Sequence, residues 1–321
     1  MKIKIKKKIK NILLPIIGCL IFLFIIFYLV DVKILFNIFK KVNYWYLVPV
    51  FFLTFLLLGF KAWRWKMLMK KQEIEYSFKK SFSFYSVASF LSLATPGKIG
   101  EIVKIFYLQN DGHSINKSLV TIIIDRIFDF LFLIFLILIG FLIFIQIFFS
   151  EIIYLCLIIL ICVILFYFIL KTKIYLKLIY FFVPQKHHEN IFIHLQDFKD
   201  NFKKYNYKNY LLGFGATFLA WLVYLVQIYF LSLALGLRLN IFYLIPMIAV
   251  ANATDLLPIS FNGLGTREAV FIFFFGLINL SPEKATALGI LQLFTVFSAA
   301  IIGFFYWIFN PINFKTLSKK V

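Results

Sequence analysis

The chain of 321 residues is 63% apolar and 15% charged, whereas soluble domains are roughly half apolar and a quarter charged. The apolar residues form long blocks and lipid cannot satisfy an open sheet edge, so composition excludes a soluble fold and argues against strands. The formal net charge of +20 comes from Lys and Arg between those blocks, which indicates cytoplasmic loops rather than a nucleic-acid surface. The sequence therefore predicts an all-α integral membrane protein of the cell (inner) membrane.

The N-terminal half is predicted to hold four full spans and one interrupted segment. The interrupted segment consists of residues 81–95 and 102–108, which are each too short to cross the bilayer comfortably. Residues 96–101, which contain Pro and Gly, separate them, and two half-length helices with such a break predict a re-entrant hairpin. The first span is expected to be retained rather than cleaved as a signal peptide. The four full spans are residues 11–30, 44–60, 118–149 and 152–170.

A polar and basic segment, residues 171–208, precedes the C-terminal half. Apolar side chains recur in it at helical spacing and predict an amphipathic helix on the membrane surface, namely Ile191, Leu195, Phe198 and Phe202. Two further spans, residues 211–235 and 285–309, lie on either side of a second interrupted segment, residues 241–280. Pro and Gly at 258–268 predict a second re-entrant hairpin there. The total is about six full transmembrane helices and two re-entrant helical hairpins.

The two interrupted segments resemble each other. A shift of 167 positions aligns Glu101 with Glu268 and Lys117 with Lys284 without a gap. Most Lys and Arg lie in loops on the side of the N-terminus, which predicts that both the N- and C-termini are cytoplasmic. The hairpins then enter from opposite sides, and units 44–150 and 211–309 form an inverted repeat within one membrane domain, 1–321, as transporters do. Chance similarity in a chain rich in Phe and Ile is the alternative.

The hairpin tips are candidate anion sites. Thr95 and Thr266 are predicted to cap the half-helices that follow the breaks. Helix N-termini present N–H groups that favour anions, and Lys98 and Arg267 add positive charge beside them. Two such ends that converge from opposite sides would make a site of the size of a phosphate.

Glu101 and Glu268 follow the tips within two helical turns. A charge at depth needs a partner, so they are expected to pair with Lys104, Arg126 or Arg267, or to carry a proton. The alternative is that each acid only complements its helix dipole. The turns themselves are assigned to Pro96, Gly97, Gly100, Pro258, Gly263 and Gly265, which could also do no more than shape the tips.

A third group of charges, Asp125-Arg126-x-x-Asp129, interrupts the span 118–149. The two aspartates share a helix face and Arg126 can reach Asp129, although this part of the helix could instead lie at the membrane interface. Arg64, between Trp63 and Trp65, is interpreted as an interfacial anchor. No His or Cys spacing indicates a metal site. The candidate substrate-binding residues are Lys98, Glu101, Lys104, Asp125, Arg126, Asp129, Asn262, Arg267 and Glu268.

Residues 96–101 (PGKIGE), the Asp125-Arg126-x-x-Asp129 group and the run from Pro258 to Glu268 together resemble the lysylphosphatidylglycerol synthase transmembrane region, or flippase-like domain, family. The resemblance covers nearly the whole chain, and Gly263-Leu264-Gly265-Thr266-Arg267-Glu268 is its most specific part. Lys104 stands where the family usually has Arg, and Asp125 where it often has Glu. The resemblance implies a stand-alone member, without the aminoacyl-transferase domain, that translocates a phospholipid, a polyprenyl-linked lipid or a glycolipid.

Two other functions remain open. An intramembrane lipid-linked glycosyltransferase would need an acidic site on a sizeable outer loop, and the predicted outer loops are short. A non-transporting scaffold for envelope enzymes is the third hypothesis. The expected partners are membrane lipids, anionic or polyprenyl-phosphate-linked, with no nucleic acid and no cofactor. Whether a homo-oligomer forms is left open.

Overall fold

The computed structural model describes residues 16–93, 95, 100–143, 172, 188–256 and 259–311. Within these ranges every regular element is helical. Three helices of 28 residues each are long and apolar enough to cross a bilayer: Tyr44–Lys71, Tyr207–Ala234 and Pro282–Phe309. The bent pair Ile16–Leu29 and Val32–Lys40 would make a fourth span. The prediction of an all-α, multi-pass membrane protein is therefore confirmed.

The N-terminal helix does not continue straight into the next loop. Ile16–Leu29, whose last turn is a π-helix (η1, Ile25–Leu29), meets α2 (Val32–Lys40) at an angle of 96°. Asp31 explains the start of α2, because its carboxylate accepts hydrogen bonds from the backbone N–H groups of Lys33 and Ile34 at 2.7 and 3.2 Å. The sequence analysis did not predict α2.

The first half of the chain then forms two long helices with two short ones between them. A 3₁₀ turn (η2, Tyr44–Tyr46) leads into α3 (Leu47–Lys71), which runs well past the predicted end at Phe60. The short helices are α4 (Phe78–Leu93) and α5 (Val103–Asn110), and the long helix α6 (Ile115–Ile143) follows. Two short helices with a break between them agree with the prediction for 81–108, although Pro96, Gly97 and Lys98 lie outside the described residues.

The second half has the same order of long and short helices. It consists of α10 (Tyr207–Ala234), α11 (Ile241–Asp255), α12 (Thr266–Leu277) and α13 (Pro282–Phe309). Pro258, in the break between α11 and α12, and the predicted span 152–170 lie outside the described residues.

Helix α9 (His188–Lys203) confirms the helix predicted before the C-terminal half. Two of the four apolar residues that predicted it, Phe198 and Phe202, pack against a buried cluster that contains Leu68 of α3 and Phe128 of α6. The side chains of Ile191 and Leu195 lie outside the described part of the chain.

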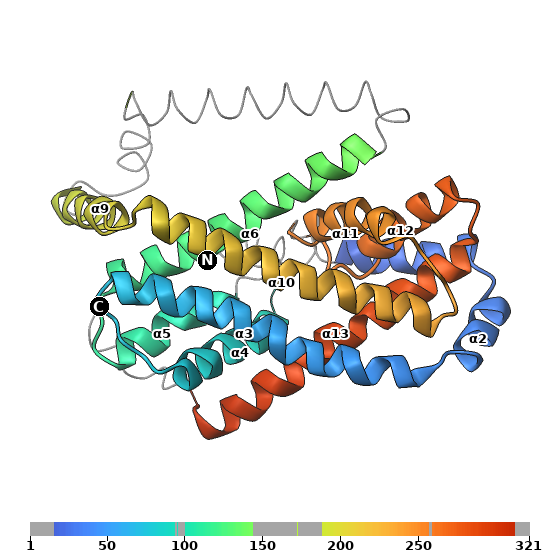
Figure 1. Ribbon diagram of the computed structural model, residues 1–321, viewed down its shortest axis with the longest axis horizontal. Helices are drawn as coiled ribbons and strands as arrows, with labels where there is room; N and C mark the ends of the chain where they lie inside the picture. The colour runs from blue at the N-terminus through green and yellow to red at the C-terminus, as the bar shows by residue number, and fades with distance from the viewer. Residues whose placement is uncertain are drawn as a thin grey trace, which may run out of the picture.

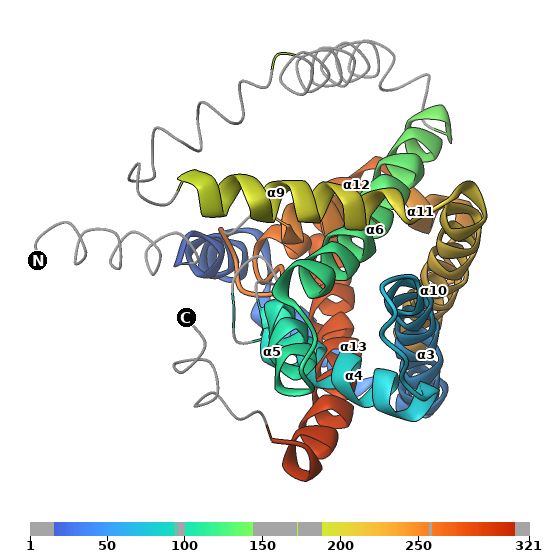
Figure 2. The same ribbon diagram turned by 90° about the vertical axis from the view of Figure 1, so that its left-hand side faces the viewer.

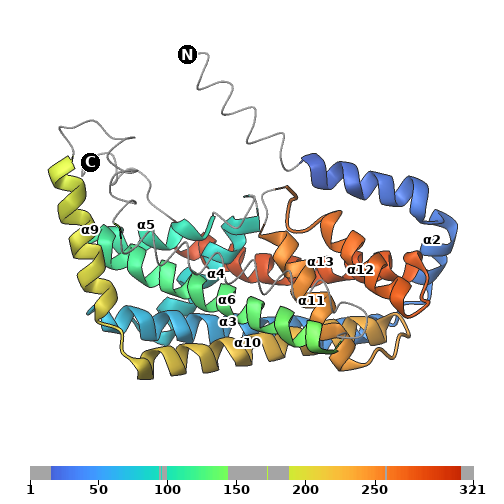
Figure 3. The ribbon, with the colours of Figure 1, turned by 90° about the horizontal axis from the view of Figure 1, so that it is seen from above.

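The long helices lie roughly side by side along the long axis of the molecule, with α9 at one end and α2 at the other (Figures 1 and 3). Helix α3 packs along α10, α4 along α13, and α6 along α11. Figure 2 looks along this axis and shows α3 beside α10 and α13 beside α4. Each half of the chain therefore completes its packing with helices of the other half.

Small residues allow the closest of these crossings. A Cβ on Gly303 of α13 would lie 2.2 Å from the backbone oxygen of Ser86 in α4. A Cβ on Gly140 of α6 would lie 2.4 Å from Cβ of Pro246 in α11. Helices in lipid gain stability from such close packing, because lipid tails are as apolar as the side chains and burial alone drives little association.

Candidate functional site

A cluster of seven charged side chains joins α3, the start of α5 and the middle of α6. Its centre is Asp125, which is fully buried. Arg64 of α3 contacts it through Nη2 and Nε at 2.7 and 2.8 Å, and Lys104 of α5 contacts it at 3.0 Å. Asp125 is therefore enclosed by protein rather than exposed on the surface of α6. The cluster consists of Lys61, Arg64, Glu101, Lys104, Asp125, Arg126 and Asp129.

Arg64 ties three helices together. Besides Asp125, it contacts Asp129 at 2.9 Å and donates to the hydroxyl of Thr217 in α10 at 2.6 Å. The planar guanidinium can make these contacts at once, which an ammonium group could not do in a fixed geometry. The interpretation of Arg64 as an interfacial anchor is wrong, because its side chain is 0% exposed.

Glu101, two residues before α5, and Lys104, in its first turn, form an ion pair of 3.0 Å. The Lys104 ammonium also lies 3.8 Å from the centre of the Tyr85 ring, a cation–π contact that helps a buried ammonium. The expected pairing of Glu101 is confirmed for both Lys104 and Arg126, since Arg126 approaches the same carboxylate at 2.6 Å.

Arg126 and Lys61 form the more open side of the cluster. The Arg126 side chain is 33% exposed and also pairs with Asp129 at 3.2 Å, as the three-residue spacing predicted. Lys61 approaches Asp129 at 3.7 Å and is 26% exposed. The cluster holds four cations and three carboxylates, so its formal net charge is +1.

A second buried ion pair lies at the start of α12. Glu268 accepts a hydrogen bond from the backbone N–H of Gly265 at 2.6 Å and pairs with Arg267 at 3.1 Å. The N-cap is therefore Gly265, not Thr266. The Glu268 carboxylate accepts the hydrogen bond of the Gly265 N–H, one of the helix N-terminal groups that were predicted to bind an anionic substrate. Asn262 donates to the backbone oxygen of Leu93 at 2.9 Å and so connects this turn to the end of α4.

The turn before α12 requires glycine at two positions. Gly263 and Gly265 have φ angles of +77° and +86°, a region that side chains disfavour. A Cβ would lie 2.0 Å from Oδ1 of Asp255 at the first and 2.0 Å from the oxygen of Gly18 at the second. In the other break, the backbone N–H of Gly100 donates to the hydroxyl of Thr95 at 2.7 Å.

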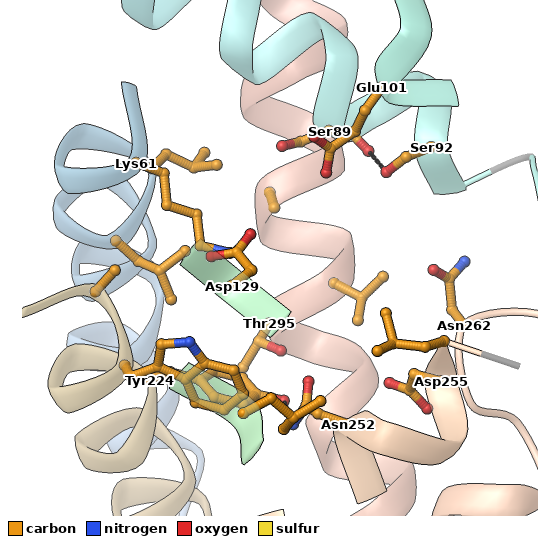
Figure 4. Close-up of a pocket in the computed structure, with 18 of the residues that line it drawn as sticks. Lys61, Ser89, Ser92, Glu101, Asp129, Tyr224, Asn252, Asp255, Asn262 and Thr295 are labelled. Atoms are coloured by element: carbon orange, nitrogen blue, oxygen red, sulfur yellow. Dashed lines mark hydrogen bonds and ion pairs between the residues drawn. The ribbon is translucent and has the colours of Figure 1, made fainter. Parts of the chain in front are cut away.

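A cavity of about 570 Å³ lies between the two groups of charges. Glu101, Arg126 and Asp129 line one part of it, and Asn262 and Arg267 line another. In the view of Figure 4, Glu101 lies near the top, Asn252 near the bottom, Asp129 between them, and Asp255 and Asn262 on the right. Apolar side chains complete the wall, among them Leu57, Leu58, Ile123, Ile127, Phe130 and Leu133.

The structure thus brings most of the predicted site residues to one cavity. Lys104, Asp125 and Glu268 do not line it, but they contact the lining residues Glu101, Arg126 and Arg267, respectively. Lys98 lies outside the described residues. In the part of the chain that the structure describes, no group of three or more His, Cys, Asp or Glu could hold a metal ion. Sequence reasoning missed Lys61, Tyr85, Trp221, Tyr224, Gln227, Asn252, Asp255 and Gln292, polar or aromatic residues that line the cavity.

The fold and the buried charges define a multi-pass α-helical membrane protein with a polar cavity among its helices. The chain belongs to the lysylphosphatidylglycerol synthase TM region family, whose pattern matches residues 15–307. A UPF0104 membrane protein of Methanothermobacter thermautotrophicus is 21% identical over 279 residues, which cover 79% of this chain and 81% of the relative. A UPF0104 membrane protein of Methanocaldococcus jannaschii is 27% identical over 223 residues, 67% of this chain and 91% of the relative. No solved structure matches the chain.

Proposed function

We propose that the protein is a flippase-like transporter that moves a lipid with an anionic headgroup, a phospholipid or a polyprenyl-phosphate-linked lipid, between the leaflets of the cell membrane. The observation that carries the proposal is the cavity of about 570 Å³, which has charged residues and an apolar wall side by side. A lipid has the same two parts. The headgroup would contact Arg126 and Lys61, and the chains would contact the wall formed by Leu57, Ile123 and Phe130.

The charge of the cluster favours an anion. Arg126 and Lys61 are its most exposed cations, and they contribute to a net charge of +1 around the cavity wall. A phosphate that enters from the headgroup region would replace part of its hydration with these donors. The fully buried pairs, such as Arg64 with Asp125, would hold the cavity in shape and would not contact the lipid.

An inverted repeat would let the cavity open to either side in turn. The helix order long–short–short–long occurs twice, as α3 to α6 and as α10 to α13. The contacts also exchange reciprocally, since the second helix of each unit packs on the last helix of the other, α4 on α13 and α11 on α6. This pattern supports a two-fold relation between units 44–150 and 211–309. In this proposal α4/α5 and α11/α12 are re-entrant hairpins, and six full spans surround them.

The distribution of basic residues supports cytoplasmic termini. The end of the molecule that holds α9 also holds the C-terminus of α3 and the N-terminus of α4, with Lys70, Lys71, Lys79 and Lys80 (Figure 1). The opposite end, near α2, carries fewer basic residues, among them Lys33 and Arg238. The basic end is therefore the cytoplasmic one in this proposal.

Reconstitution into vesicles tests the proposal. Purified protein is inserted into liposomes that contain a fluorescent phosphatidylglycerol, and an impermeant reductant bleaches the outer leaflet. Transport bleaches more than half of the label, whereas protein-free vesicles retain the inner half. Ser89 lines the cavity, so Ser89→Phe should block transport by filling space, and Ser89→Ala is the matched control. Equal bleaching by the wild type and the Ser89→Phe variant would refute transport through this cavity.

A further inference from the structure

The part of the cavity wall formed by α10, α11 and α13 has a different chemistry from the charged cluster. It presents neutral polar and aromatic groups, centred on Tyr224. Gln292 of α13 and Asn252 of α11 both donate to the Tyr224 hydroxyl oxygen, the second at 3.4 Å. Trp221 lies one turn earlier in α10, with its ring centre 5.8 Å from that of Tyr224. These groups carry no formal charge, so this part of the wall suits a neutral polar group of a ligand rather than an ion.

Two buried polar atoms in this wall have no partner among the described residues. One is a donor, the indole N–H of Trp221, and the other is an acceptor, the side-chain oxygen of Gln292. Gln292 is only 2% exposed, and both side chains line the cavity. Buried polar atoms are rarely left unsatisfied, so a ligand is expected to offer an acceptor to the Trp221 N–H and a donor to the Gln292 oxygen. A hydroxyl does both, whereas an ammonium only donates and a phosphate only accepts.

A third buried atom without a hydrogen-bond acceptor among the described residues belongs to the charged cluster. Nη2 of Arg126 contacts Glu101 and Asp129, but its Nε has no acceptor there. This donor lies on a cationic side chain of the same cavity. An anionic oxygen would satisfy it with a charge-assisted hydrogen bond.

Matching positions in the two halves carry these two chemistries. Arg64 and Tyr224 are each the eighteenth residue of their helices, α3 and α10. Asp125 and Gln292 are each the eleventh residue of α6 and α13. In the first half, Arg64 and Asp125 form an ion pair of 2.7 Å. In the second half, Tyr224 and Gln292 form a neutral hydrogen bond. The second half therefore has an amide and a phenol where the first has charges.

We infer that the cavity recognises a headgroup of two parts, a phosphate at Arg126 and a hydroxyl-bearing group, a polyol or a sugar, at Trp221 and Gln292. This inference rests on the proposed function, which requires only that the lipid has an anionic headgroup and apolar chains. It narrows the substrate class to polyol or glycosyl phosphate lipids. The Asp255 carboxylate, which also lines the cavity, adds an acceptor for further hydroxyls.

Four lipids with identical acyl chains test the inference by equilibrium binding to the purified protein in mixed micelles. Phosphatidylmethanol has the phosphodiester charge without hydroxyls, phosphatidylglycerol and phosphatidylinositol add hydroxyls, and phosphatidylethanolamine adds an ammonium. The two hydroxyl-bearing lipids should bind about tenfold more tightly than phosphatidylmethanol, as expected for one or two added hydrogen bonds.

Two variants locate the preference. Gln292→Met and, separately, Trp221→Phe should bring the ratio of the affinity for the hydroxyl-bearing lipids to the affinity for phosphatidylmethanol close to one. Gln72→Met is the matched control, because Gln72 is also fully buried with an unpartnered side-chain oxygen among the described residues but does not line the cavity.

The outcomes separate this inference from the proposed function. Equal binding of phosphatidylmethanol, phosphatidylglycerol and phosphatidylinositol overturns the inference and leaves lipid transport intact. Tighter binding of phosphatidylethanolamine than of the hydroxyl-bearing lipids also overturns it, in favour of an ammonium subsite. Binding of none of the four lipids overturns the proposed function and the inference with it.

Discussion

Arg64 and Asp125 lie 61 positions apart in the chain and form two contacts of 2.7 and 2.8 Å, with neither side chain exposed. A buried ion pair contributes little net stability relative to apolar packing, but the loss of one partner leaves an uncompensated charge. Lys104 at 3.0 Å also contacts Asp125, so one carboxylate connects α3, α5 and α6. The register of these helices therefore depends on charge as well as on packing.

The first prediction concerns Arg64. Arg64→Met removes the closest cation of the fully buried Asp125, which keeps Lys104 at 3.0 Å and Arg126 at 3.5 Å. It also removes the contact of 2.9 Å to Asp129, so the free energy of unfolding should fall by about 3–5 kcal/mol. Arg64→Lys should recover only part of the loss, because an ammonium cannot reproduce the fork. Unfolding in detergent and abundance in the membrane are the measurements. Lys70→Met, on an exposed residue of the same helix, is the control, and equal stability of both Met variants would contradict the prediction.

Gly265 carries the second prediction. Its φ angle of +86° and the 2.0 Å separation between a Cβ and the Gly18 oxygen leave no room for alanine. Gly265→Ala should lower the unfolding temperature strongly and detach the N-terminal helix from the turn. Gly215→Ala should be neutral or slightly stabilising, because Gly215 is helical with open space around it and alanine favours helix by about 1 kcal/mol. A Gly265→Ala protein as stable as the wild type would contradict the prediction.

The sequence predicted the features that depend on spacing within one helix. The pairings of Glu101 with Lys104 and of Arg126 with Asp129 follow from three-residue helical spacing, and the structure contains both. Apolar blocks likewise predicted the long helices. Arg64 was wrongly interpreted because its acidic partners, Asp125 and Asp129, lie on another helix. No residue near Arg64 in the sequence indicates this pairing. Its position after Phe60 suggested the membrane surface, whereas α3 continues to Lys71.

The cavity could not be predicted for a similar reason. Tyr224 and Gln292 lie 68 positions apart, and each looks like an isolated polar residue in an apolar span. Helix α2 was overlooked because α2 lies outside the long apolar blocks, although Asp31 has the position of a helix cap. The cavity forms where helices far apart in the sequence pack together. The periodicity of residues along one helix carries no information about that packing.

The third prediction separates two roles of Glu268. Glu268→Ala removes the acceptor of the Gly265 N–H and the partner of Arg267, so stability should fall by about 3 kcal/mol or more. Glu268→Gln keeps an acceptor for the N–H and should lose less. Glu75, an exposed acid between α3 and α4, is the control, and Glu75→Ala should change stability by no more than about 0.5 kcal/mol. Unfolding curves decide, and a Glu268→Ala protein as stable as the wild type would assign Glu268 to function alone.

The fourth prediction is that Arg126→Gln strongly reduces transport of anionic lipid while the fold survives. Without Arg126, Glu101 still pairs with Lys104 at 3.0 Å and Asp129 with Arg64 at 2.9 Å, so no carboxylate is left alone. The cluster loses its net positive charge, and the cavity loses its most exposed guanidinium. Transport of phosphatidylglycerol in vesicles should fall by about tenfold or more, as expected when a charged hydrogen bond to a ligand is removed. Lys117→Gln, outside the cavity, is the control. Full transport by Arg126→Gln would remove this residue from the substrate site.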